Sequence, residues 1–247
     1  MNEQNYFGGK IHDLIRREAH GEEMVFSSFL TAEEGETAAS ICKNAGAPYL
    51  LYGGFDHAER KMLGVSSMEH TLLKPCFPIA MLSIEAYRPE LISNRDILGA
   101  VMATGVRRDC LGDIVARKGV LLMVVAAHIA PFLIENLSKI GNQHVRLNEV
   151  YGEIHVPEPE YQSLRLTVAS MRLDAVVAAL AKISRDQACQ MIEAGSISVN
   201  HIPVVKKTKE IFGGDRVVIR GKGKWILDSC DGTTKKGRIV LDCKKYI

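Results

Sequence analysis

The segment SMRLDAVVAALAKISRDQACQMIEAGSISVN, residues 170–200, contains two helix signals and two arginines at the expected helix starts. Its first half has an apolar stripe at helical spacing, formed by Leu173, Val176, Val177 and Leu180. We expect Ser170 to cap this first helix. Ser184 is the predicted cap of a second helix, which Gly195 ends in the left-handed conformation. The segment therefore predicts a short helical hairpin.

A small β-ribbon is predicted to follow the hairpin. Ile197 and Val199 alternate with serines, and Asn200-His201 forms a turn before the apolar residues 202–205. Helices and ribbon together indicate an α+β fold for this part of the chain.

Arg185 lies in the first turn of the second predicted helix, where a cation faces the positive end of the helix dipole at a cost of about 0.3–1 kcal/mol. A bound phosphate would explain the placement, because a helix start offers unpaired N–H groups and an arginine adds a bidentate donor. The alternative is an ordinary surface arginine offset by Asp186. This position alone leaves both interpretations open.

The net charge of +2 conceals an uneven distribution. Residues 163–247 contain 16 Lys and Arg against 8 Asp and Glu, a balance of +8, whereas residues 1–162 contain 15 against 21, a balance of −6. Such a division is typical of a basic nucleic-acid-binding domain joined to an acidic body. A basic domain without a ligand is the alternative.

The length of 247 residues allows two or three domains. The longest apolar run, residues 119–127, is too short to span a bilayer, and no signal peptide opens the sequence, so we expect no membrane span and a cytoplasmic location. The six cysteines show no CxxC spacing, which favours reduced thiols over a zinc site or disulfides. We predict no cofactor, no metal ligands and no catalytic residues.

Residues 1–75 are predicted to form a small, mostly helical unit. Thr31 begins a capping box for a helix that stops near Gly46, and residues 49–52 resemble a strand. Residues 53–60 are interpreted as a glycine turn followed by a short helix.

Residues 76–156 give the order β-α-β-β-α-β. This order is typical of a ferredoxin-like sheet, the architecture also used by RRM domains. The predicted strands are 79–86, 113–116, 120–126 and 145–156; the predicted helices are 94–103, capped by Ser93 or Asn94, and 130–140.

An RRM stacks bases on aromatic residues of its central strands, but residues 79–85 and 120–127 contain none. The domain is therefore expected to bind RNA weakly, or to act as a spacer or a protein-docking surface. The basic residues that could contact RNA, or equally form a solvated face, are Arg107, Arg108, Arg117 and Lys118. Residues 156–160, with two prolines and two acids, are the predicted linker to a strand at 163–168.

The C-terminal region resembles the S4 RNA-binding domain. The resemblance rests on Arg172-Leu173-Asp174, Ser184-Arg185, Ala188, Ile192, Gly195, Val199-Asn200, Gly214-Asp215 and Arg220-Gly221-Lys222-Gly223. It implies a helical hairpin joined to a small twisted sheet that grips structured RNA, with Arg172 and Arg185 at the family's arginine positions. His201 stands where the family often has glycine, and Ser196 where valine is common.

Residues 94–100 (NRDILGA) and 112–114 (GDI), together with the order of domains, resemble the bacterial YlmH family over nearly the whole chain. The resemblance implies an α+β protein with an N-terminal unit at 1–75, a ferredoxin-like domain at 76–156 and an S4 domain at 163–247. It also implies a cytoplasmic, ribosome-associated RNA-binding protein. The implied partners are the rRNA of the large subunit, with stalled peptidyl-tRNA and cell-division proteins as further candidates.

The expected mechanism is binding. Arg172 and Arg185 should lie side by side, one at each helix start, and clamp the phosphate backbone of an rRNA hairpin, so that RNA shape sets specificity. Because both are expected at the surface, alanine should weaken ribosome binding without unfolding the chain. Further contacts are predicted from Lys182, Ser184, Gln187, Lys206, Lys207, Lys209, Arg220, Lys222 and Lys224, although the lysines also suit a solvated face.

Two other functions are compatible with parts of the sequence. An RNA-modifying enzyme, of the pseudouridine synthase or methyltransferase type, would fit the S4 resemblance, but the glycine-rich loop and catalytic domain are missing. Arg172-Leu173-Asp174 offers a synthase-like aspartate only superficially, since it lies inside the S4 helix. The other alternative is a cell-division interaction scaffold with RNA binding secondary.

Overall fold

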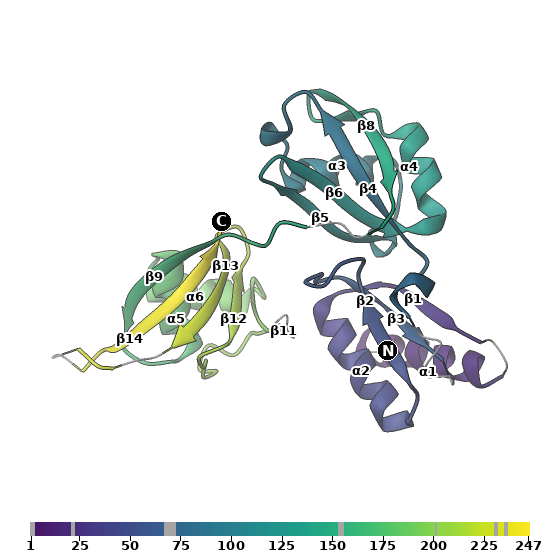
Figure 1. The fold of residues 1–247 in the computed structure, drawn as a ribbon. Helices are drawn as coiled ribbons and strands as arrows, with labels where there is room; N and C mark the ends of the chain where they lie inside the picture. The colour runs from purple at the N-terminus through teal and green to yellow at the C-terminus, as the bar shows by residue number, and fades with distance from the viewer. Residues whose placement is uncertain are drawn as a thin grey trace. The chain divides into compact units, whose positions relative to one another are not determined.

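A computed structural model describes residues 3–20, 23–66, 73–152, 156–200, 202–229, 232–234 and 237–247. The chain divides into two compact units, Met1–Glu158 and Pro159–Ile247 (Figure 1). The described residues form antiparallel sheets combined with helices, which confirms the α+β class. His201 and Cys230 lie outside the described residues.

The N-terminal part of the first unit has two helices packed on a three-stranded sheet of order β1-β3-β2. The elements are α1 Glu3–Ala19, β1 Val25–Leu30, α2 Ala32–Ala45, β2 Tyr49–Tyr52 and β3 Lys61–Val65. The predicted capping box is confirmed: Thr31 N–H donates to Glu34 Oε2 at 2.7 Å, and Thr31 Oγ1 accepts from Glu34 N–H at 3.2 Å. Gly46 ends α2 at φ 65°.

The short helix predicted after Gly53-Gly54 is wrong, because residues 53–60 form turns. The carboxylate of Asp113, on a distant strand, accepts the N–H groups of Glu59 and Arg60 at 2.6 and 3.0 Å. Those N–H groups therefore bind a side chain instead of the helical carbonyls.

The second part of this unit has the predicted order β-α-β-β-α-β, with one added short strand. Its helices pack on one sheet face, where Ile97 and Leu133 share a core with Leu82 and Met123. The elements are β4 Ile79–Ala86, α3 Asn94–Ala103, β5 Leu111–Arg117, β6 Val120–Ala126, α4 Ala130–Asn136, β7 Lys139–Ile140 and β8 Gln143–Val150, in the sheet order β5-β6-β4-β8-β7. Single 3-10 turns occupy Lys74–Cys76, Pro89–Leu91, Arg108–Cys110 and Ala127–Ile129.

The prediction of one helix over residues 130–140 is wrong in its second half. The helix ends at Asn136, and Lys139 and Ile140 pair with His144 and Gln143. Ile140 is buried at 1% exposure, so its apolar character suits a strand in the core as well as a helix. The final strand, predicted over 145–156, covers Gln143–Val150, and residues 153–155 lie outside the described ranges.

The N-terminal sheet covers the face of the second sheet that α3 and α4 leave open. Phe29, Met62 and Phe77 form one buried cluster with Val124 and Ala126 of β6. The Arg60 guanidinium adds hydrogen bonds of 3.0 Å to the carbonyl oxygens of Phe29 and Leu111. Both segments lie within one compact unit, so a domain division at residue 75 stays a prediction.

Gly53→Ala is expected to lower the free energy of unfolding by about 1–3 kcal/mol, the usual cost of overpacking. A Cβ at Gly53 would clash with the carbonyl oxygen of Arg60 and lie 2.5 Å from Ala58 Cβ. Urea denaturation measures the change. Gly99→Ala is the matched control, because a Cβ there meets nothing within 4 Å and lies in a helix, where alanine gains up to about 1 kcal/mol. Equal stabilities of the two variants would contradict the packing argument.

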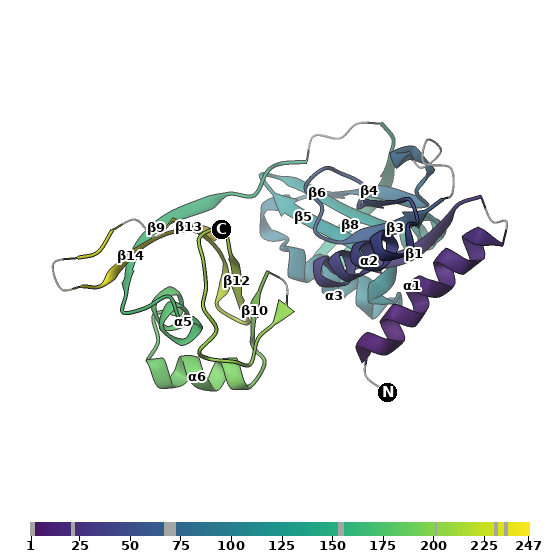
Figure 2. The ribbon, with the colours of Figure 1, turned by 90° about the horizontal axis from the view of Figure 1, so that it is seen from below.

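The second unit is a helical hairpin on a six-stranded sheet of order β11-β10-β12-β13-β14-β9. Figure 2 shows α5 and α6 on one side of this sheet, where Leu173, Ile192 and Trp225 share the core. The elements are β9 Tyr161–Val168, α5 Leu173–Ala181, α6 Arg185–Glu193, β10 Ile197–Val199, β11 Ile202–Pro203, β12 Arg216–Ile219, β13 Gly223–Ser229 and β14 Ile239–Tyr246. The hairpin and the ribbon are thus where the sequence predicts them.

Ser170 is not the cap of α5. The N-cap is Arg172, which makes no side-chain capping bond. Instead, Leu173 N–H donates to Lys209 O at 2.8 Å and Asp174 N–H to Lys207 O at 3.2 Å. Carbonyls from a distant loop therefore satisfy the first N–H groups, which a local cap would otherwise bind. Ser184 does cap α6, and Gly195 has φ 66°.

Candidate nucleic-acid interface

Arg172 and Arg185 meet on one carboxylate. Arg172 donates from Nε to Asp174 Oδ1 at 3.2 Å and from Nη2 to Oδ2 at 3.0 Å. Arg185 donates from Nε to Asp174 Oδ2 at 3.1 Å, and its Nη2 lies 3.0 Å from the same oxygen. The two arginines therefore lie side by side at the starts of α5 and α6; their role in RNA binding stays a prediction.

Arg172, Asp174 and Arg185, called the trio below, differ in solvent exposure. The Asp174 side chain is 4% exposed, whereas Arg172 and Arg185 are 40% and 50% exposed. Burial by itself raises the pKa of Asp174, but the hydrogen bonds and charges of the two arginines outweigh it and hold that pKa below its usual value. The trio therefore carries a net positive charge, with its anion beneath and its cations at the surface.

The arrangement leaves donors for a ligand. The bonds to Asp174 use Nε and Nη2 of each arginine, so that in the described part of the chain Nη1 of each has no partner. The carboxylate also fixes both planar guanidinium groups before any ligand arrives. A phosphate group can accept hydrogen bonds from such paired forks at little cost in side-chain entropy.

Ser184 and Gln187 are engaged in the cap of α6. Ser184 Oγ accepts from Gln187 N–H at 3.2 Å, and Gln187 Oε1 accepts from Ser184 N–H at 3.1 Å. Lys182, which is exposed, ends α5 in the left-handed conformation at φ 53°. The cap accounts for Ser184 and Gln187 structurally, and their predicted RNA contacts would use only the hydroxyl proton and the amide NH₂.

The loop that carries Lys206, Lys207 and Lys209 lies against the start of α5, because its carbonyls bind the N–H groups of Leu173 and Asp174. Lys206 and Lys207 are exposed, and Lys209 is half-buried. Lys207 Nζ forms an ion pair with Glu193 at 3.2 Å. The fold thus brings this basic loop beside the arginine pair, a proximity that sequence separation alone does not reveal.

The remaining predicted residues lie in the turn between β12 and β13 and at the start of β13. Arg220 and Lys222 are exposed, and Arg220 N–H binds Ser196 O at 2.9 Å. Lys224 Nζ lies 4.5 Å from the ring centre of Tyr246. Lys224 therefore belongs to a sheet surface instead of the helix starts.

The three predicted arginines of the first unit contact other residues of that unit. Arg107 binds Asp109 at 2.8 Å, and Arg117 Nη1 donates to Pro157 O at 3.3 Å. Arg108 donates to Leu111 O at 2.8 Å, and burial, with the nearby charge of Arg60, lowers its pKa to about 10. These contacts and the covered sheet face show how the arginines and the sheet are held in the fold, and RNA binding by this domain stays a prediction.

The chain is similar to known proteins in three comparisons. Residues 77–154 match the family described as "Putative RNA-binding domain in YlmH". Over 218 residues the chain is 28% identical to "Ribosome-associated protein quality control protein P2" of Bacillus subtilis (strain 168), covering 87% of this chain and 84% of that protein. Residues 77–154 of the chain are therefore similar to a domain of YlmH proteins. A solved structure, "Cell division protein ylmH from Streptococcus pneumoniae", shares the fold at a TM-score of 0.54 and 20% identity, covering 61% of this chain and 93% of that one.

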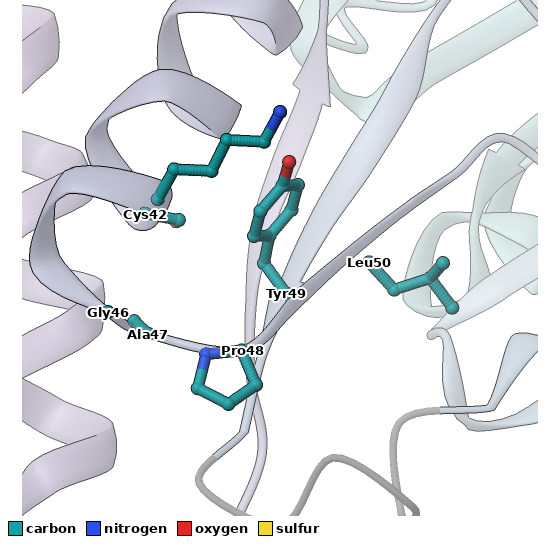
Figure 3. Close-up of a pocket in the computed structure, with 7 residues that line it drawn as sticks. Cys42, Gly46, Ala47, Pro48, Tyr49 and Leu50 are labelled. Carbon is teal, nitrogen blue, oxygen red and sulfur yellow. The ribbon is translucent and has the colours of Figure 1, made fainter.

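The described residues show little that resembles a catalytic centre. A pocket of about 420 Å³ lies at the end of α2, lined among others by Cys42, Tyr49 and Leu50 (Figure 3). Burial raises the pKa of the Cys42 thiol, which keeps it protonated and unreactive. In the described ranges no group of three His, Cys, Asp or Glu could hold a metal ion. None of the described helices is both long and apolar enough for a bilayer crossing.

Asp174 is the residue whose role sequence reasoning missed. The alternative of a synthase-type aspartate does not suit it, because its carboxylate is buried and occupied by two arginines. The Arg172-Leu173-Asp174 motif could have indicated that Asp174 pairs with Arg172. Its second partner, Arg185, lies 11 residues after Asp174. Only the fold of the hairpin shows that one carboxylate serves both arginines.

Proposed function

We propose that this protein is a non-catalytic, cytoplasmic RNA-binding protein that docks on structured rRNA of the large ribosomal subunit through residues 163–247. Its proposed task is the handling of stalled peptidyl-tRNA complexes in ribosome-associated quality control. The observation that carries the proposal is the pair of half-exposed arginines fixed on a buried carboxylate. The name of the Bacillus subtilis relative supports an association with the ribosome, and the match of residues 77–154 to an RNA-binding domain family supports a role on RNA.

The geometry favours a backbone clamp. Two fixed guanidinium groups beside the Lys206–Lys209 loop present several positive charges over one region, and phosphates accept such contacts without regard to base sequence. We therefore infer that the hairpin with its sheet is an S4-type domain and that RNA shape provides the specificity.

For residues 76–156 we propose a ferredoxin-like, RRM-like architecture. One face of its sheet packs against the N-terminal sheet, and this packing forms a joint within the first unit. The order β5-β6-β4-β8 supports the architecture, and the buried Phe29, Met62 and Phe77 support the joint. Cell-division proteins stay candidate partners; no observation on the described surface favours them over RNA.

Co-sedimentation with isolated ribosomal subunits tests the proposal. The parent is expected to sediment with the large subunit, and the neutral variant R172Q/D174N/R185Q to stay in the supernatant. The matched control is D13N/R16Q/K43Q, which makes the same change of charge at exposed residues of the first unit outside residues 77–154. Sedimentation of the parent with neither subunit, or equally with both, would contradict docking on the large subunit.

A further inference from the structure

The open face of the six-stranded sheet carries an aromatic and basic row outside the site described above. Tyr161 of β9 lies directly opposite Tyr246 of β14, and the two ring centres are 4.9 Å apart at an interplanar angle of 66°. Lys224 of β13 places its Nζ 4.5 Å from the Tyr246 ring centre. Three adjacent strands therefore contribute one continuous row.

The row faces away from the core. Trp225, the next residue along β13, is 2% exposed and lies in the core beneath the helices. Because successive side chains of a strand point to opposite faces, Lys224 and its cross-strand neighbours lie on the face without helices. Tyr161 is 39% exposed there, so its ring is accessible to a ligand.

Two acids on this face of the sheet are paired with cations. On the same face, Asp242 is bound by Arg165 at 2.7 Å and Asp228 by Lys244 at 3.1 Å, so both acids are already neutralised. Exposed Lys222 lies in the turn before β13. Lys222 and Lys224 are therefore the cations that a phosphate group would meet beside the rings, and the exposed acid Glu160 precedes Tyr161.

We propose that Tyr161, Tyr246 and Lys224 form a stacking platform for unpaired nucleotides of RNA. A tyrosine ring offers its face to a base of any sequence, and a neighbouring lysine binds the adjoining phosphate. Paired bases are already stacked on their neighbours, so the platform selects single-stranded segments. The arginine pair follows the far end of β9, roughly 23 Å of strand from Tyr161 at about 3.3 Å per residue. The platform is thus a second RNA site, independent of the proposed clamp.

The test uses the full chain and three labelled probes in fluorescence anisotropy: decamers of adenosine, of uridine and of abasic ribose phosphate. The parent is expected to bind the adenosine decamer most tightly and the abasic decamer most weakly, because only bases can stack. Equal affinity for the adenosine and abasic decamers in the parent would overturn the proposal without any variant.

Variants then locate the site. Y161V/Y246V is expected to weaken adenosine-decamer binding by about five- to a hundredfold, whereas Y161F/Y246F keeps the rings and the affinity. Y87V, at a tyrosine 90% exposed in the first unit, is the control. In the R172Q/D174N/R185Q background the loss caused by the tyrosine changes should persist, which separates this proposal from the clamp. Unchanged binding by a folded Y161V/Y246V protein would overturn it.

Discussion

Replacing both Arg172 and Arg185 by alanine is expected to lower the free energy of unfolding by about 3 kcal/mol at neutral pH. The change strands the Asp174 carboxylate, 4% exposed, without either partner. We take the low end of the cost for a broken buried ion pair, because the half-exposed arginines leave a path for water. The expectation from sequence, that alanine at both positions would leave the fold undisturbed, thus omits the anion beneath them.

The loss of stability in the double alanine variant should depend on pH in a defined direction. In the parent, the folded pKa of Asp174 lies below its usual 3.8, so its contribution is present above pH 3.8 and is lost as pH falls through the folded value. Without the arginines, burial alone would raise that pKa, and stability would fall as pH rises above 3.8. The difference between parent and variant should therefore be largest near neutral pH and shrink toward pH 4.

Urea denaturation at several pH values measures this difference. R172Q/D174N/R185Q is the control, because it retains polar groups that can hydrogen-bond and removes the buried charge; it should recover most of the lost stability. A double alanine variant whose deficit stays constant from pH 4 to 7 would show that Asp174 is not the cause.

The variant R172Q/D174N/R185Q should bind a structured RNA hairpin about a hundredfold more weakly than the parent at low salt. Two charge-assisted contacts of about 1.5 kcal/mol each give a loss of about 3 kcal/mol, which corresponds to that factor. Each lost phosphate contact also reduces the slope of log affinity against log salt by about 0.9, so the slope should flatten by about 1.8.

Titrations at four salt concentrations measure both quantities. D13N/R16Q/K43Q should keep the parental slope, since its three residues lie outside the proposed clamp and outside residues 77–154. A neutral variant with weaker binding but an unchanged slope would mean that the trio supports the fold of the site without touching phosphate.

The helix caps formed by residues close in sequence were the part of this fold that the sequence could predict. The caps at Thr31, Ser93 and Ser184 each depend on a side chain and a backbone N–H three residues apart, and all three appear in the structure. The start of α5 was mispredicted because carbonyls from residues 207 and 209 replace a local cap.

Contacts between residues far apart in the sequence could not be predicted from sequence patterns. Apolar residues of β6 gave no sign of whether RNA, solvent or the N-terminal sheet would cover them, and the structure places Phe29 and Met62 there. The candidate arginines were predictable by resemblance, whereas the carboxylate that joins them, and the meeting of Tyr161 with Tyr246, depend on folded contacts.

The position of β9 at the edge of its sheet has a consequence for synthesis. Its strand partner in the described sheet is β14, paired from Val168 with Ile239 to Tyr161 with Tyr246. The ribosome must therefore make about 70 further residues before β9 gains any hydrogen-bonded neighbour, and such distant pairing is slow to form. Until then, the backbone groups of β9 lack their strand partner, so this strand is open to pairing with another chain during synthesis.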